Sequence, residues 1–217
     1  MLSRLAQAFV RRLLTPFAKA LLKLGFSPDA VTIIGAIGVI GGALWFFPRG
    51  EFGWGTLVVT LFVFSDTLDG TMARLSGRAS PWGAFLDSTL DRIGDASVLG
   101  GILMYFAAQP DGHLTAWFAL ACLVFGFMVS YARARAEGLG VDAKGGIAER
   151  ADRLVVVLVA TGLTGLFDLP EIVLTVVLAI LAVASAVTVV QRMASVKRQT
   201  SLADSSANVT GHGTARP

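Results

Sequence analysis

The chain contains six long apolar segments separated by short polar connections. They cover residues 30–47, 55–73, 83–107, 114–136, 154–167 and 172–190. A helix needs about 17–25 mostly apolar residues to cross a hydrocarbon core of about 30 Å, and every segment except the fifth reaches that length by itself. The fifth needs its charged flanks, Asp152, Arg153 and Asp168, to complete a crossing. Because the runs are continuous and do not alternate between apolar and polar positions, strands of a membrane barrel are excluded. The pattern therefore predicts an all-α integral membrane protein with six transmembrane helices.

The segments that flank the six apolar runs have a different character. Residues 1–25 place apolar side chains at helical spacing with basic residues between them, which predicts an amphipathic helix lying in the membrane interface. A signal peptide fits this stretch poorly, because it has no uninterrupted apolar core and no small-residue cleavage site. Residues 196–217, rich in Ser, Thr, Ala and Gly towards their end, are predicted to form a disordered cytoplasmic tail. Residues 26–195 then form the six-helix transmembrane domain that carries the chemistry.

Composition agrees with a membrane location. Hydrophobic residues make up 54% of the chain and charged residues only 15%, whereas soluble domains carry about 25% charged residues. This composition argues against a soluble enzyme and against a nucleic-acid-binding protein. The chain has one cysteine, Cys122, so neither a disulfide framework nor a cysteine zinc site is expected.

The basic residues predict the orientation of the chain in the membrane. Lys and Arg gather in the N-terminal stretch, the second and fourth connections and the end of the last apolar segment, whereas the opposite side contains only Arg49. Because basic residues concentrate on the cytoplasmic side of membrane proteins, both termini are predicted to face the cytoplasm. The predicted location is the cytoplasmic membrane, crossed several times.

Five acidic residues lie inside the second and third apolar segments. They are Asp66, Asp69, Asp87, Asp91 and Asp95, and within each segment their spacing of three or four residues places them on one helix face. A charged side chain near the middle of a spanning helix costs about 2.5–3.5 kcal/mol on insertion scales, so such residues usually mark a functional site. Carboxylates brought together repel one another, and divalent cations that prefer oxygen ligands offset this repulsion. A pair of such ions is the arrangement that clamps the oxygens of a phosphoryl-transfer reaction.

Two other interpretations of these acids stay open from the residues alone. The acids can form salt bridges with Arg74 and Arg92 inside the bundle, or they can line a proton or cation path in a transporter. Spacing and composition therefore predict either a metal-dependent membrane enzyme or a membrane cation transporter.

The acidic segment has a more specific resemblance. Its residues read Asp66-x2-Asp69-Gly70-x2-Ala73-Arg74-x8-Gly83-x3-Asp87-x3-Asp91. This run resembles, without a departure, the signature of the CDP-alcohol phosphotransferase family, which are membrane enzymes with six spanning helices. They join a CDP-linked alcohol to an acceptor alcohol and release CMP. The resemblance also implies a homodimer, for which Gly35, Gly38, Gly41 and Gly42 offer a close-packing face that meets either a neighbouring helix or a second subunit.

The resemblance implies a role for each residue of the signature. Asp66, Asp69, Asp87 and Asp91 match the aspartates that hold two divalent ions, Mg²⁺ or alternatively Mn²⁺, and Asp91 also matches the general base for the acceptor hydroxyl. CDP-diacylglycerol is expected to bind at Asp29, Thr32, Gly70, Arg74 and Gly83. The glycines are also explained by tight helix packing, and Ser27-Pro28-Asp29 is also explained as a capped helix start. Asp95 lies outside the signature and is expected to be a partner of Arg92 or a group behind the ligands.

A group of arginines points to the acceptor. Arg133, Arg153 and Arg192 are predicted to lie at the cytoplasmic end of the bundle, where three guanidinium groups suit one phosphate group. The runs 130–137 and 145–153 resemble the actinobacterial phosphatidylinositol phosphate synthases, which implies inositol 1-phosphate as acceptor and these three arginines as its phosphate ligands. Arg133 departs from the Lys that is frequent there, although the charge is kept.

Alternatives for the acceptor remain. A phosphatidylglycerophosphate synthase of the same family uses glycerol 3-phosphate and also needs a phosphate pocket, so the basic cluster alone does not separate the two. A cardiolipin synthase is less favoured. A cation transporter does not require Gly70, Gly83 and a phosphate pocket of three arginines.

Overall fold

The chain folds into a set of long helices. The computed structural model describes residues 14–143 and 145–211, with only the backbone described for Asp66 and for residues 202–211. Its elements are α2 (Pro28–Phe46), the 3-10 turn η1 (Phe47–Arg49), α3 (Phe52–Ser76), α4 (Pro81–Ala107), α5 (His113–Glu137), α6 (Arg150–Phe167) and α7 (Glu171–Gly211). Residues 14–23 are helical as well, and the described part of the chain contains no strand. The all-α prediction is confirmed, and each predicted apolar segment lies in one of the helices α2 to α7.

Several of the helices have the length and composition of membrane spans. Four stretches are long and apolar enough to cross a bilayer, namely Pro28–Arg49, Phe52–Ser76, His113–Glu137 and Glu171–Ser201. The other two helices, α4 and α6, are 27 and 18 residues long and are not among these four stretches. The count of six spans therefore stays a prediction.

Two helices begin with the same local sequence at the same end of the bundle. The Ser27 hydroxyl accepts a hydrogen bond from the Ala30 amide at 3.1 Å, and Pro28 follows as the first residue of α2. The Ser80 hydroxyl accepts one from the Gly83 amide at 3.0 Å before α4. A serine N-cap followed by proline starts a helix at a defined residue, because proline needs no hydrogen-bonded amide there. These starts set the register of the polar residues that follow on α2 and α4.

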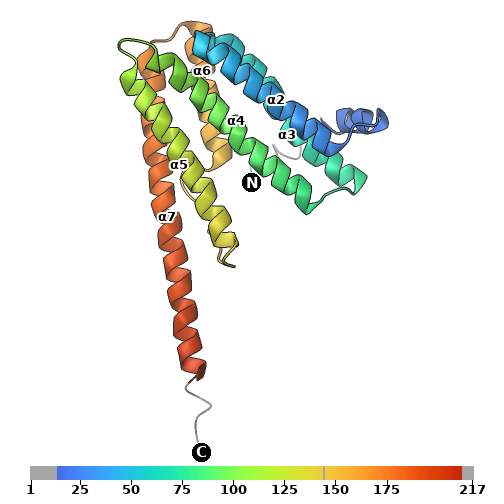
Figure 1. The fold of residues 1–217 in the computed structure, drawn as a ribbon, viewed down its shortest axis with the longest axis vertical. Coiled ribbons are helices and arrows are strands. Elements are labelled where there is room, and N and C mark those ends of the chain that lie inside the picture. Colours follow the sequence, from blue (N-terminus) through green and yellow to red (C-terminus); the bar gives the residue numbers. More distant parts are fainter. Residues whose placement is uncertain (1–13, 144, 212–217) are drawn as a thin grey trace, which may run out of the picture.

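The helices pack in an order that places α2, α3, α4 and α6 around one region. Helix α2 packs on α3 and α4, α3 packs on α6, and α5 packs on both α4 and α7 (Figure 1). The far end of this bundle is closed by the rings of Phe47, Phe52, Tyr105 and Phe106, which lie 4.9–6.1 Å apart between centroids. Large apolar side chains such as Ile37, Leu61 and Val183 are exposed on the outer faces. A soluble protein seldom exposes so continuous an apolar surface, whereas lipid tails solvate it.

Glycines allow close approach between helices, as the sequence suggested for the first apolar segment. A Cβ atom added at Gly35, Gly38 or Gly42 would collide with side chains of α3, whereas one added at Gly41 would meet no atom within 4 Å. Three of the four glycines therefore face a neighbouring helix of the same chain. This contact accounts for them without a second subunit.

The two flanking segments are described only in part. Most of the predicted interfacial helix 1–25 lies outside the described residues, although Ala18 is buried against Val31 and Met72. At the other end, the predicted disordered tail starts at residue 196, whereas α7 continues as a helix to Gly211. The structure differs from the prediction here, because extending an existing helix adds a hydrogen bond per residue without the cost of nucleation. Residues 212–217 lie outside the described part.

Candidate functional site

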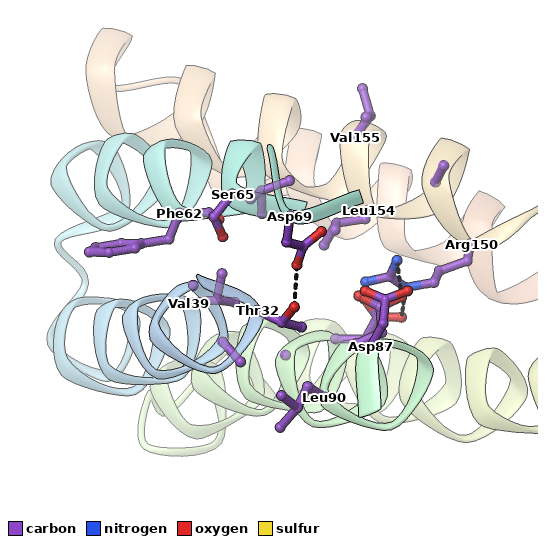
Figure 2. Close-up of a pocket in the computed structure, with 17 residues that line it drawn as sticks. Thr32, Val39, Phe62, Ser65, Asp69, Asp87, Leu90, Arg150, Leu154 and Val155 are labelled. Carbon is purple, nitrogen blue, oxygen red and sulfur yellow. Dashed lines mark hydrogen bonds and ion pairs between the residues drawn. The ribbon is translucent and has the colours of Figure 1, made fainter. Parts of the chain in front are cut away.

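A cavity of about 140 Å³ opens between α2, α3, α4 and α6. Val39, Phe62 and Leu154 contribute apolar lining, and Figure 2 shows Phe62 at the end remote from Arg150. The polar residues of the lining include one basic group and all four of the predicted acids whose side chains are described. These residues are Thr32, Asp69, Asp87, Asp91, Asp95 and Arg150. The cavity thus combines an apolar part with a strongly charged part.

Asp69 is held from the facing helix. Its side chain is buried on α3, and its Oδ2 atom accepts a hydrogen bond of 2.5 Å from the Thr32 hydroxyl of α2. Figure 2 shows these two side chains pointing toward each other between the helices. The Thr32 hydroxyl also lies 3.1 Å from the Pro28 carbonyl, which restricts its rotation. Asp66 lies one turn before Asp69 on α3, and its side chain is outside the described part.

Asp87 and Asp91 approach the cavity from α4. They are four residues apart, so they lie on one face of that helix. The Asp91 Oδ2 atom forms an ion pair with Arg150 Nη1 of α6 at 2.6 Å, and its side chain is about one-fifth exposed, at 19%. Figure 2 shows Asp87 and Arg150 facing each other across the same space. The predicted acids are therefore brought together from two helices, and Arg150 joins them from a third.

The donor atoms of this cavity suit a hard divalent cation. Asp69, Asp87 and Asp91 supply carboxylate oxygens, and the lining contains no histidine or cysteine, which is the chemistry preferred by Mg²⁺ and Mn²⁺. In the described arrangement, no three His, Cys, Asp or Glu side chains converge on one ion position. The side chain of Asp66, the fourth predicted ligand, is not among those described. The residues fit a divalent ion in their chemistry, and the ligand set stays a prediction.

The residues predicted to bind CDP-diacylglycerol lie at the capped ends of these helices. A Cβ atom at Gly83 would lie 3.5 Å from Asp29 Oδ1, so the starts of α2 and α4 are adjacent. A Cβ atom at Gly70 would lie 3.5 Å from Arg74 Nη1, while Arg74 itself is exposed and donates to the Thr71 hydroxyl at 3.3 Å. Thr32 links this region to Asp69. Their role in lipid binding stays a prediction.

The three predicted acceptor ligands have different surroundings. Arg153 is buried, with Nη2 3.5 Å from Asp95 Oδ2. Arg192 is also buried and donates to the carbonyls of Val129 at 2.5 Å and Gly145 at 3.1 Å. Arg133 is exposed and pairs with Glu137 at 2.9 Å. The three side chains therefore have different partners, and their convergence on one phosphate group stays a prediction.

Two residues of the site, Arg150 and Asp95, have partners that the sequence did not predict. Arg150 was counted among the basic flanks that set the orientation, whereas it lies between Asp91 and Asp95. Asp95 was expected to be a partner of Arg92 or a group behind the ligands; Arg92 Nη2 lies 4.0 Å from it, and Arg150 Nε lies closer, at 3.2 Å. A sequence signal did exist, because Asp95 extends the i, i+4 series of Asp87 and Asp91, and Arg150 and Arg153 share one face at the start of α6. Their meeting depends on the tertiary arrangement that places α4 and α6 on either side of the cavity.

Known proteins resemble this chain over most of its length. The CDP-alcohol phosphatidyltransferase family matches residues 26–147. Phosphatidylinositol phosphate synthase of Streptomyces avermitilis is 50% identical over 209 residues, which are 94% of this chain and 86% of that protein. The synthase of Cutibacterium acnes is 50% identical over 195 residues, which are 86% of this chain and 93% of that protein.

Solved structures show the same fold. The crystal structure of Mycobacterium tuberculosis phosphatidylinositol phosphate synthase with CDP-DAG bound has a TM-score of 0.82 at 42% identity, covering 85% of this chain and 94% of that one. The structure of the same enzyme with manganese and citrate has a TM-score of 0.81 at 42% identity, covering 84% and 88%. The acidic signature, the helical fold and these relatives agree, and the chain belongs to the CDP-alcohol phosphatidyltransferase family.

Proposed function

We propose that this protein transfers the phosphatidyl group of CDP-diacylglycerol to inositol 1-phosphate and releases CMP. The observation that carries the proposal is the ion pair between Asp91 and Arg150 within the cavity that Asp69 and Asp87 also line. A carboxylate beside a basic group provides both a proton acceptor and an attraction for a phosphorylated acceptor. Relatives that are 50% identical to this chain carry the name phosphatidylinositol phosphate synthase, which supports the choice of acceptor.

The acidic side chains are proposed to hold the divalent ions. Asp66, Asp69, Asp87 and Asp91 form the ligand set, and the ions are two Mg²⁺, with Mn²⁺ as a substitute. The oxygen-only donors of the cavity support this choice, and the related Mycobacterium tuberculosis enzyme has a structure with manganese. Such ions, when bound, offset the charge of the diphosphate and stabilise CMP as the leaving group.

The residues of this chain supply the remaining steps. Asp91 accepts the proton of an acceptor ring hydroxyl while the hydroxyl oxygen attacks the β-phosphorus. The bond between that phosphorus and the bridging oxygen breaks, and CMP leaves with the electron pair. Thr32 holds the carboxylate of Asp69 in place through its 2.5 Å hydrogen bond. Arg153, Arg192 and Arg133 attract the phosphate of the acceptor, and Asp29, Thr32, Gly70, Arg74 and Gly83 hold the CDP-lipid.

The membrane arrangement completes the proposal. We place all six helices α2 to α7 across the cytoplasmic membrane, with the N-terminal helix in the interface and the site and both termini on the cytoplasmic side. Exposed tryptophans at both ends of the bundle support this placement: Trp45, Trp54 and Trp117 lie at one end, and Trp82 lies at the other. Tryptophan concentrates at both membrane interfaces. A homodimer is proposed from the family resemblance.

The experiment that tests the function is CMP release by the purified full-length protein. It uses CDP-diacylglycerol and Mg²⁺ with inositol 1-phosphate, glycerol 3-phosphate or free inositol as acceptor. We expect release with inositol 1-phosphate alone. Release with glycerol 3-phosphate in its place would overturn the acceptor but keep the reaction class. No release with any acceptor would overturn the transferase proposal and favour the transporter alternative, which ion-flux measurements in liposomes then address.

A further inference from the structure

Asp95 is the residue on which Arg92, Arg150 and Arg153 converge. It lies one turn beyond Asp91 on α4, it is 7% exposed, and it is not part of the acidic signature. Its Oδ2 atom accepts a hydrogen bond from Arg150 Nε at 3.2 Å and one from Arg153 Nη2 at 3.5 Å. Arg92 Nη2 lies 4.0 Å from the same oxygen. One carboxylate oxygen thus orients guanidinium groups from two helices.

Arg150 uses its two ends for two different acids. Its Nε atom bonds to Asp95, while its Nη1 atom reaches Asp91 Oδ2 at 2.6 Å. The planar guanidinium group has fixed angles between its N–H bonds, so the contact with Asp95 also determines where Nη1 points. Asp95 therefore orients the group that contacts the proposed general base.

The guanidinium groups around Asp95 are only partly satisfied. Arg92, Arg150 and Arg153 share the carboxylates of Asp91 and Asp95. Within the described part of the chain, Arg153 Nη1 and Arg92 Nε are buried without a hydrogen-bond partner. Buried polar atoms normally have partners, and guanidinium donors without a partner suit a phosphate group.

We propose that Asp95 is a positioning residue, which holds Arg150 and Arg153 in the orientation that receives the acceptor phosphate and aligns its hydroxyl with Asp91. This proposal rests on the proposed function, because it assumes a phosphorylated acceptor. Asp95 acts through the two arginines, which both donate hydrogen bonds to its Oδ2 atom.

The substitution Asp95→Asn separates positioning from simple electrostatics. Removing a negative charge beside three arginines makes the site more positive, so electrostatics alone predicts tighter binding of a phosphorylated acceptor and a lower KM. Loss of the charged hydrogen bonds frees Arg150 and Arg153, so positioning predicts a higher KM. The two explanations give opposite signs.

The test measures kcat and the KM of each substrate for the full-length protein in lipid nanodiscs. We expect Asp95→Asn to raise the acceptor KM about tenfold, which corresponds to the loss of one charged hydrogen bond, with the KM of CDP-diacylglycerol within about twofold of wild type. Asp95→Glu keeps the charge but displaces the carboxylate by one methylene, so a smaller rise of the acceptor KM is expected. Asp152→Asn is the matched control, because it removes the same charge at an exposed position between Arg150 and Arg153 in the sequence. We expect this variant to leave the KM of both substrates unchanged.

The outcomes separate this proposal from the proposed function. An acceptor KM that is unchanged or lower in Asp95→Asn overturns the positioning role. If Asp95→Asn does not fold, Asp95→Glu carries the test, and an unchanged acceptor KM in that variant has the same meaning. Wild-type turnover is measured first with inositol 1-phosphate and glycerol 3-phosphate, so a wrong acceptor is recognised in the wild type, and the variants are then compared with the acceptor that is used.

Discussion

The carboxylate of Asp91 and the guanidinium group of Arg150 form an ion pair of 2.6 Å that joins α4 to α6 across the cavity. Within an apolar bundle, such a pair is stable only if both charges have further partners. Asp95 provides a second partner for Arg150 at 3.2 Å. The ion pair thus links the acidic residues of the signature with the basic residues at the start of α6, which the proposed reaction uses together.

Replacement of Asp91 tests the general base. We expect Asp91→Asn to lower kcat by at least about 10²-fold, because an amide does not take up the proton of a hydroxyl at neutral pH. Binding of CDP-diacylglycerol, measured by isothermal titration in detergent, is expected to remain. Asp111→Asn, at an exposed position in the connection between α4 and α5, serves as the charge-matched control. Near-normal turnover of Asp91→Asn would remove its role as base.

Replacement of Thr32 distinguishes two roles for that residue. Thr32→Val removes the hydrogen bond to Asp69, so we expect the Mg²⁺ concentration that gives half-maximal activity to rise about tenfold, as loss of a group behind a metal ligand typically does. Thr32→Ser keeps the hydroxyl and is expected to behave like wild type. A change confined to the KM of CDP-diacylglycerol would instead assign Thr32 to the lipid alone.

A small substitution beside Arg153 tests the acceptor site without altering any charge. A Cβ atom at Gly126 would lie 3.0 Å from Arg153 Cζ, so Gly126→Ala displaces this buried guanidinium group. We expect a higher KM for inositol 1-phosphate and little change for CDP-diacylglycerol. Gly100→Ala is the control, because a Cβ atom there would meet no atom within 4 Å. An unchanged acceptor KM in Gly126→Ala would argue against Arg153 as a phosphate ligand.

The sequence predicts the helices well because their causes are local. Continuous apolar runs and the Ser-Pro start at Ser27 place the helix boundaries, except the end of α7, within a few residues of those in the structure. The acids on α3 and α4 were also predictable as two shared faces, since residues three or four apart lie together on any helix. Their convergence at one cavity agrees with the antiparallel order of the two helices.

Contacts between helices that are distant in the sequence could not be predicted in the same way. Arg150 has the sequence context of an ordinary basic flank, and only the placement of the start of α6 across the cavity from α4 brings it to Asp91 and Asp95. The glycines of α2 left open whether they face a helix or a subunit, and the contact with α3 depends on the tertiary arrangement. The helical extension of α7 beyond residue 196 likewise follows from its continuity with a stable apolar helix rather than from its own composition.

Thr188 gives a last prediction, because it fixes the connection that leads into α6. Its hydroxyl accepts a hydrogen bond from the Ala148 amide at 3.1 Å and donates to the Ala184 carbonyl at 2.8 Å. Thr188→Val leaves the buried Ala148 amide without this partner, at a cost of about 1–3 kcal/mol. Because Ala148 lies two residues before Arg150, we expect a lower melting temperature together with a raised acceptor KM.

Two controls separate these effects. Thr188→Ser keeps the hydroxyl and is expected to retain both the melting temperature and the acceptor KM. Gln199→Ala removes the contacts of Gln199 with the amide and carbonyl of Asp142, which lie farther from Arg150 along the same connection, so a smaller effect on the acceptor KM is expected. If Thr188→Val lowered the melting temperature but left the acceptor KM unchanged, the connection would stabilise the fold without positioning Arg150. If Thr188→Val raised the acceptor KM and the two control variants did not, the start of α6 would determine how the acceptor binds.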